Sequence, residues 1–115
     1  MRIDVLGDES ISRQARTYAE YRLFAALPYV VDPSRVRRAR VVLHVIDPEQ
    51  RCAQVACSVT IELDGGEELA LSVTGAHPYA AINRMIDQLR DDAMQWEGAG
   101  GQRGVPAVVS TIGTP

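Results

Sequence analysis

The sequence predicts a two-layer α+β domain in which two helices cover one face of a mostly antiparallel, four-stranded sheet. Four segments alternate apolar and polar residues with the period of a strand, and two repeat apolar residues with the period of a helix. Their order along the chain is β-α-β-β-β-α. Elements with one apolar side bury that side against each other. We therefore expect both helices on one face of the sheet, and a polar, exposed opposite face.

The first strand and the first helix lie in residues 2–27. Residues 2–6 alternate Ile3 and Val5 with polar neighbours and end at Gly7. Ser10 or Ser12 then caps a helix, because a serine oxygen accepts one of the unpaired first-turn N–H groups. Pro28 ends the helix or closely follows its end. The predicted buried face of this helix consists of Ile11, Ala15, Tyr18, Ala19, Leu23 and Leu27.

Three long strands and a second helix follow. The strands are predicted at residues 35–46, 53–63 and 68–74, and the pair Gly65-Gly66 supplies the positive φ of a hairpin turn. The helix begins at His77-Pro78, since proline at the first helical position loses no needed hydrogen bond. We interpret His77 as a capping or exposed residue. The predicted apolar stripe, which ends before Gly98, is Tyr79, Ile82, Met85, Ile86, Leu89, Ala93 and Trp96.

Size and composition agree with one globular domain. The 115 residues are 46% hydrophobic and 23% charged, which excludes wholesale disorder. No apolar run approaches the roughly 18–20 residues of a membrane span, and the first residues lack a signal peptide's apolar region. We expect a soluble, cytoplasmic protein. Residues 1–97 form the domain, and residues 98–115 form a glycine-rich tail in which 105–112 either adds a strand or stays loose.

The sequence carries no pattern typical of an enzyme. His44 and His77 lie in different elements, and no group of histidine, cysteine and carboxylate has the spacing of metal ligands. Cys52 and Cys57 are an odd number of residues apart, so on one strand they point to opposite faces and bridge poorly. We expect reduced thiols, with Cys57 in the core. We predict no catalytic residue, no metal and no cofactor.

Charge is distributed unevenly along the chain. Nine arginines and seven carboxylates up to residue 51 give a net charge of +2, whereas residues 52–97 carry −6. All twelve basic residues are arginine, which a coding bias explains. Four of them, Arg35, Arg37, Arg38 and Arg40, lie within six residues. Arginine binds phosphate through a planar fork of donors, so this cluster indicates either RNA contact or a solubilising strand edge.

The connection from the last strand to the second helix resembles a known signature. It runs Val73-Thr74-Gly75-Ala76-His77-Pro78-Tyr79-Ala80-Ala81-Ile82-Asn83 and continues Met85-Ile86-Asp87-Gln88-Leu89. It is similar to the strand-to-helix phrase of ribosome hibernation-promoting factors, also called ribosome-associated inhibitors or sigma-54 modulation proteins. The first strand with Gly7, the helix start at Ile11-Ser12 and the strand at Val41-Val42-Leu43 are similar too. The resemblance covers residues 1–96.

The resemblance implies a fold like that of double-stranded-RNA-binding domains. It also implies binding to rRNA in the decoding channel of the small ribosomal subunit, where such factors block mRNA and tRNA sites and inhibit translation under stress. RNA recognition of this kind is dominated by phosphate and shape. The matched basic positions are Arg16, Arg22, Arg38, Arg40, Arg84 and Arg90. Tyr79 and Asn83 are motif residues, and Tyr79 is either a core anchor, which the helix stripe favours, or a base-stacking residue.

The second helix departs from the family pattern. Family members carry several basic residues there, whereas this chain has Gln88, Asp91, Asp92, Gln95 and Glu97. His77-Pro78 replaces the usual acidic start, and the tail does not resemble the family's dimerising domain. The alternative is a protein-interaction module that keeps the fold without ribosome binding and pairs, for example with a second copy, through a sheet edge or the tail. A continuous basic stripe across the first helix and Arg38/Arg40 favours RNA, and interrupting acids favour the module.

Overall fold

The computed structural model describes residues 2–46 and 54–98. It contains four strands and two helices in the predicted order. Their bounds are β1 (Arg2–Gly7), α1 (Arg13–Ala26), β2 (Val36–Ile46), β3 (Gln54–Leu63), β4 (Glu68–Gly75) and α2 (Pro78–Gly98).

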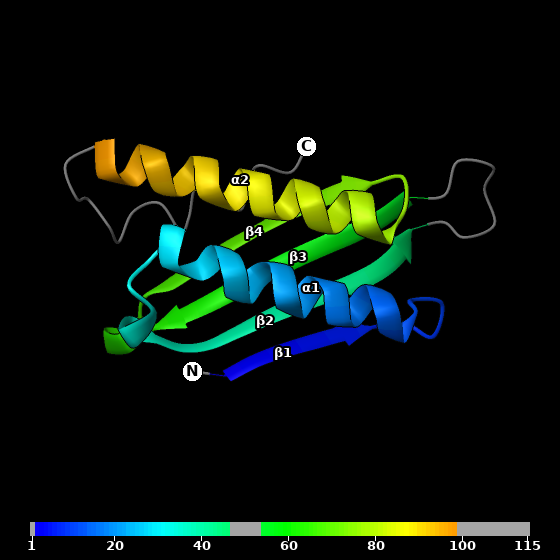
Figure 1. Cartoon of the computed structure of the whole chain (residues 1–115), viewed down its shortest axis with the longest axis horizontal. Coiled ribbons are helices and arrows are strands. Elements are labelled where there is room, and N and C mark those ends of the chain that lie inside the picture. Colours follow the sequence, from blue (N-terminus) through cyan, green and yellow to red (C-terminus); the bar gives the residue numbers. More distant parts are fainter. Residues whose placement is uncertain (1, 47–53, 99–115) are drawn as a thin grey trace.

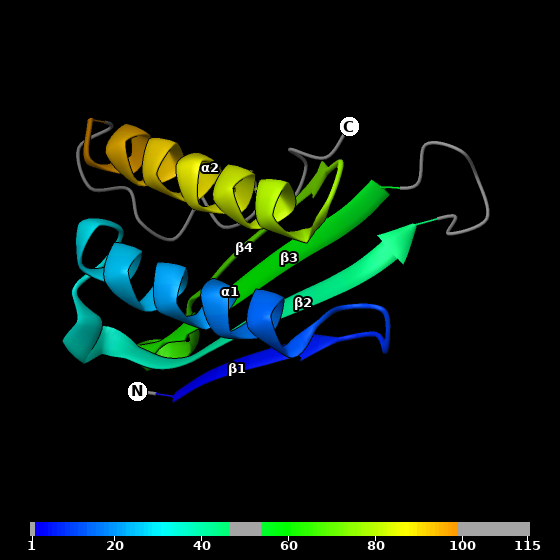
Figure 2. The ribbon, with the colours of Figure 1, turned by 45° about the vertical axis from the view of Figure 1, so that its right-hand side comes forward.

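The four strands form one sheet in the order β1-β2-β3-β4. β1 and β2 are parallel and are joined by the crossover through α1, whereas β2, β3 and β4 are antiparallel neighbours. Both helices lie on the same face of the sheet and run in the same direction, with α1 beside β1 and β2 (Figure 1). Figure 2 shows the two layers from another side. The predicted α+β architecture is confirmed.

The core lies between the sheet and the helices. Alternate residues of β2 and β3 point into it, which is the period-2 pattern expected for strands with one covered face. α1 contributes mainly alanines, which allow the helix to approach the sheet closely, and α2 contributes larger side chains. The most deeply buried large side chains are Ile11, Leu23, Leu27, Leu43, Ile61, Ile82, Met85, Ile86 and Leu89.

Both helices begin with a side-chain cap. Of the two predicted serines, Ser12 caps α1, and its Oγ accepts a hydrogen bond from the Ala15 N–H at 3.1 Å. His77 caps α2, because its Nδ1 accepts the Ala80 N–H at 3.2 Å. Gly75 lies so close to α2 that a Cβ there would be 2.5 Å from the Ala81 nitrogen. The predicted glycine turn is present as well, with φ of 87° at Gly65 and 89° at Gly66.

Three details differ from the prediction. Arg35 lies in a short 3-10 turn (Pro33–Arg35) that precedes β2, and the first pairs of β2 are irregular between Val36 and Arg38. Tyr79 is 38% exposed and packs at the rim of the core, so it is not the buried anchor that the stripe suggested. The helix-free face of the sheet is not uniformly polar, because Ala56 is buried there and Leu6 lies half exposed.

Cys57 is a buried free thiol in the core, as predicted, and burial raises its pKa to about 12. Several predictions fall outside the described residues. These are Cys52 and the tail from residue 99, including the predicted strand at 105–112. The side chains of Trp96 and Glu97 are likewise outside the described part of the chain.

Candidate nucleic-acid interface

The predicted RNA-contacting residues divide between the two faces of the molecule. Arg38 and Arg40 alternate with the buried Ala39 and Val41 on β2, so their side chains lie on the helix-free face. Arg16, Arg22, Arg84 and Arg90, together with the motif residues Tyr79 and Asn83, lie on the two helices. Since both helices cover the other face (Figure 1), no single surface contains all six arginines.

Side chains from α1 and α2 meet along the line between the helices. The Tyr18 hydroxyl donates a hydrogen bond to Asn83 Oδ1 at 2.7 Å. The rings of Tyr18 and Tyr79 pack edge to face, with centroids 5.1 Å apart and planes at 61°. Farther along, the guanidinium of Arg90 lies over the Tyr29 ring, 5.1 Å from its centroid, in a cation–π geometry. We call this set, together with Arg22, the helix seam.

Arg22 belongs to the seam because it follows Tyr18 by four residues, which places both on the same side of α1. Its Nε is buried and has no hydrogen-bond partner within the described residues. Within these residues, the ion pairs are Arg2–Asp4, Arg38–Asp4 and Arg35–Glu67, and they include neither Arg22 nor Arg90. Among the described residues, the seam therefore has two guanidinium groups without an ion-pair partner, one of them against a tyrosine ring, and this combination suits phosphate and stacked bases.

Arg16 and Arg84 lie away from the seam. Arg16 precedes Glu20 by four residues, and Glu20 lines a depression beside Ile3 of β1, so both face the β1 side of α1. Arg84 lies on the β4 side of α2, where one of its guanidinium nitrogens donates to the Thr74 carbonyl oxygen at 3.2 Å. The structure thus joins Arg22, Arg90, Tyr79 and Asn83 and separates them from the other four predicted residues.

On the helix-free face, acids alternate with the arginines. The Asp4 carboxylate accepts from Arg2 Nε at 3.2 Å and from Arg38 Nε at 3.1 Å. Desolvation raises the pKa of Asp4, but the bonds and charges of the two guanidinium groups outweigh it, so the pKa lies below its ordinary value. Glu62 and Glu68 follow on β3 and β4, where Arg38 faces Glu62 and Glu62 faces Glu68. A continuous basic stripe, the arrangement that would favour RNA, is therefore absent from this face of the described chain.

The acids of α2 do not oppose Arg38 and Arg40. Asp91 is exposed, and Asp92 is half-buried and accepts a hydrogen bond from Gln88 Nε2 at 2.9 Å. Both belong to α2, which lies on the helix side of the sheet (Figure 2), whereas Arg38 and Arg40 point to the helix-free face. In the arginine cluster before and within β2, Arg35 pairs with Glu67 at 2.6 Å, whereas Arg37 is exposed.

The described residues also bear on two other kinds of site. No helix among them is long and apolar enough to cross a membrane. In the same part of the chain, no three histidine, cysteine or acidic side chains gather in a way that would hold a metal ion.

Sequence reasoning missed Tyr29 and the role of Tyr18. The helical spacing placed Tyr18 on the buried side of α1, but no local pattern pairs it with Asn83, 65 residues away. Tyr29 lies in the short turn after α1 (Leu27–Tyr29), where no periodicity applies. The available signal was the tyrosine ring of Tyr18 on an otherwise aliphatic helix face. A tyrosine near the core usually has a hydrogen-bond partner for its hydroxyl, so a partner for Tyr18 could have been expected.

Comparison with known proteins supports the fold. A ribosomal subunit interface protein from Coxiella burnetii has a similar structure, with a TM-score of 0.67 and 13% sequence identity. The match covers 85% of this chain and 99% of the other chain. No family model and no curated protein matches the sequence. At this identity the likeness concerns the fold.

Proposed function

We propose that this protein binds the small ribosomal subunit and blocks its mRNA and tRNA sites, which inhibits translation or promotes ribosome hibernation. The observation that carries the proposal is the structural match, over 99% of its length, to a ribosomal subunit interface protein. The strand-to-helix phrase at residues 73–89 supports it independently, because it resembles the signature of hibernation factors. The protein acts by occupying space on rRNA and performs no chemistry.

The helix seam is the surface that we assign to rRNA. Arg22 and Arg90 lack ion-pair partners within the described residues, so phosphate binding there does not require an existing salt bridge to break. Arg38, in contrast, already pairs with Asp4 at 3.1 Å. Tyr79 is partly exposed, so its ring is available for stacking on a base. We therefore expect the helix face of the molecule to contact RNA.

A second candidate is a protein-interaction module with the same fold and without ribosome binding. It is favoured by Asp4, which lies between Arg2 and Arg38 and interrupts the basic stripe that RNA binding through the sheet would use. In this case the helix-free face or a sheet edge contacts another protein.

Co-sedimentation with purified small ribosomal subunits over a series of salt concentrations separates the two candidates. A phosphate-dominated complex binds at low salt and weakens steeply as salt rises. Absence of association even at the lowest salt contradicts ribosome binding and leaves the interaction module.

A pair of double variants tests which face binds. Arg22→Ala/Arg90→Ala is expected to weaken association and to lower the slope of log affinity against log salt by about 2, since each arginine that no longer binds a phosphate lowers it by about one. Arg38→Ala/Arg40→Ala removes the same formal charge from the sheet face and serves as the matched control. Equal weakening in both variants contradicts the assignment to the seam.

A further inference from the structure

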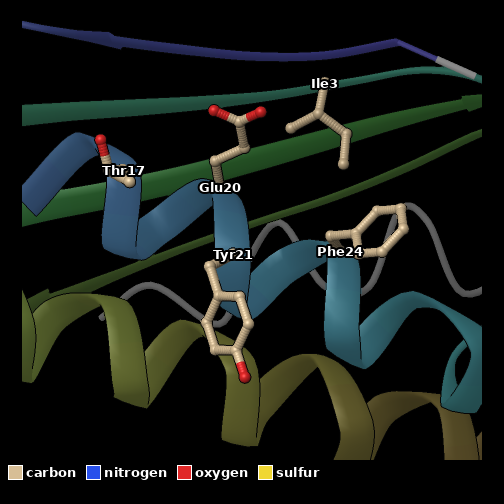
Figure 3. A pocket seen from close by; sticks show the side chains of 5 residues that line it. All are labelled: Ile3, Thr17, Glu20, Tyr21 and Phe24. Carbon is tan, nitrogen blue, oxygen red and sulfur yellow. The ribbon is translucent and has the colours of Figure 1, made fainter.

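Among the described residues, the outer edge of β1 is a sheet edge without a partner strand, and an apolar depression lies beside it. Within this part of the chain β1 is hydrogen-bonded to β2 only, so half of its backbone donors and acceptors point away from the sheet. On the helix side of this edge lies an open depression of about 310 Å³. Ile3 of β1 lines it together with Thr17, Glu20, Tyr21 and Phe24 of α1, and Tyr21 extends away from Ile3 (Figure 3).

β1 carries charges of both signs on the helix-free face. Arg2 and Asp4 are two residues apart and therefore point to the same side of the sheet. Arg2 is bonded to Asp4 within the chain, but its side chain is 74% exposed and is free to reach another carboxylate. An edge that presents both a cation and an anion is complementary to its own antiparallel copy.

We propose that two copies of this chain associate through antiparallel pairing of their β1 strands, with Ile3 opposite Ile3 of the second copy. This register places Arg2 opposite Asp4 of the other copy, twice by symmetry. The helices of both copies then lie on the same side, and the two sheets join into one of eight strands. Backbone hydrogen bonds supply attraction, and the two charge pairs fix the register.

Other registers are less favourable. With the helices of both copies on one side, as proposed, the pairing shifts only in steps that keep side chains of the same face opposite each other. The next such register places Asp4 opposite Asp4, and a like-charged pair directly across an antiparallel ladder is destabilising. The shift after that places Arg2 opposite Asp8, which lies past the end of β1 and whose carboxylate already accepts the Val45 N–H. The shift in the other direction places Arg2 opposite Arg2, which is destabilising in the same way.

The apolar residues on the helix side agree with this pairing. Phe24 is 60% exposed although it is one of the largest apolar side chains of α1. In the proposed pair, the symmetry brings Ile3 and Phe24 of one copy toward the same residues of the other, and the two depressions adjoin, with Glu20 also lining each of them. Burial of apolar area stabilises association in proportion to the area removed from water.

The opposite sheet edge does not offer the same complementarity. Glu68 is the one charged residue of β4, so no attractive charge pair forms when this strand meets its own copy. Arg84 also covers part of that edge by donating to the Thr74 carbonyl oxygen. β1 is thus the edge suited to a second copy.

Sedimentation velocity of the full chain, from micromolar to submillimolar concentration, tests the proposal. We expect a reversible monomer–dimer equilibrium. Arg2→Glu places Glu opposite Asp4, and Asp4→Arg places Arg opposite Arg2, so each variant alone is expected to dimerise about tenfold more weakly or worse. An equal mixture of the two variants restores both attractive pairs in the heterodimer, and we expect dimers to reappear on mixing.

Controls separate this result from misfolding and from ribosome binding. Arg13→Glu makes the same charge change at the start of α1, at the other end of β1, and should dimerise like the parent chain (Figure 1). Circular dichroism of each variant monitors the fold. A parent chain that stays monomeric at every concentration, or variants that do not recover on mixing, overturn the proposal. Arg2 is not among the proposed RNA contacts, so the ribosome assay succeeds or fails independently.

Discussion

Asp4 has two guanidinium partners on two strands. Its carboxylate joins Arg2 of its own strand to Arg38 of β2, and these contacts hold its pKa below the ordinary value of 3.8. A depressed pKa means that the folded state favours the ionised carboxylate. The resulting stabilisation is complete above the unfolded-state pKa and disappears as the pH falls through the folded-state pKa.

The first prediction follows from this linkage. Asp4→Asn is expected to melt at a lower temperature than the parent chain near pH 7, because both charged hydrogen bonds are weakened. The difference should shrink as the pH falls below 4 and the parent carboxyl becomes protonated. Thermal unfolding monitored by circular dichroism, from pH 7 to below pH 4, measures this difference in melting temperature. A difference that stays constant with pH contradicts the linkage.

Tyr18 connects the two helices through one hydroxyl group. Tyr18→Phe removes its 2.7 Å bond to Asn83 and leaves the edge contact with the Tyr79 ring in place. We expect a loss of about 1 kcal/mol in the free energy of unfolding, measured by urea denaturation. Tyr21→Phe is the matched control, since Tyr21 is exposed, and it should leave stability unchanged. Equal effects of the two variants would show that the hydrogen bond adds nothing to the free energy of unfolding.

Residue-scale predictions from the sequence were strongest where local pattern decides. Ala39 and Val41 alternate with Arg38 and Arg40 in the sequence. This alternation alone predicts that the two arginines face away from the helices. Arg38 and Arg40 therefore form no common basic stripe with the first helix, because the helices cover the other face of the sheet. Asn83 was selected through a resemblance, but its partner Tyr18 depends on the distance between two helices, which no local pattern encodes.

At the scale of elements, the connection from β4 to α2 depends on a close approach of backbones. A Cβ at Gly75 would lie 2.5 Å from the Ala81 nitrogen and 2.8 Å from its Cα. Gly75→Ala is therefore expected to push the first turn of α2 outward and cost about 1–3 kcal/mol of stability in denaturant unfolding. Thr74→Ala, on the neighbouring residue of the helix-free face, provides the control. If Gly75→Ala leaves the stability unchanged, α2 shifts outward without an energetic cost.

Element order and type were predictable because each element has one buried side, and burial imposes its period on the sequence. The boundaries were less predictable. Arg35 was expected in a strand, but Pro33 and the Asp32 cap form a 3-10 turn there, in which the Asp32 carboxylate accepts the Ser34 N–H at 3.0 Å. Short-range bonds of this kind compete with the sheet ladder and shorten a strand without changing its hydrophobic pattern.

At the scale of the whole molecule, the fold places the basic half and the acidic half of the chain side by side in both layers. The basic first half supplies β1, α1 and β2, and the acidic second half supplies β3, β4 and α2. Because strands from both halves are neighbours, Arg38 meets Glu62 on the sheet face, whereas Arg22 and Arg90 stay unpaired by acids between the helices within the described residues. Net charge alone therefore says little about which face binds a polyanion.

The parallel pairing of β1 with β2 also bears on the order in which the chain folds. β2, β3 and β4 are successive antiparallel neighbours, whereas β1 meets β2 only after the intervening helix is placed, a contact of longer sequence separation. At its end, Asp8 prolongs the pairing by accepting the Val45 N–H at 3.0 Å through its side chain. We expect amide hydrogen exchange, measured on dilute protein, to be slowest in β3 and fastest among the strands in β1. β1, whose outer edge pairs with a second copy in the proposed dimer, is then also the strand that opens first. Association would therefore stabilise the least protected part of the domain.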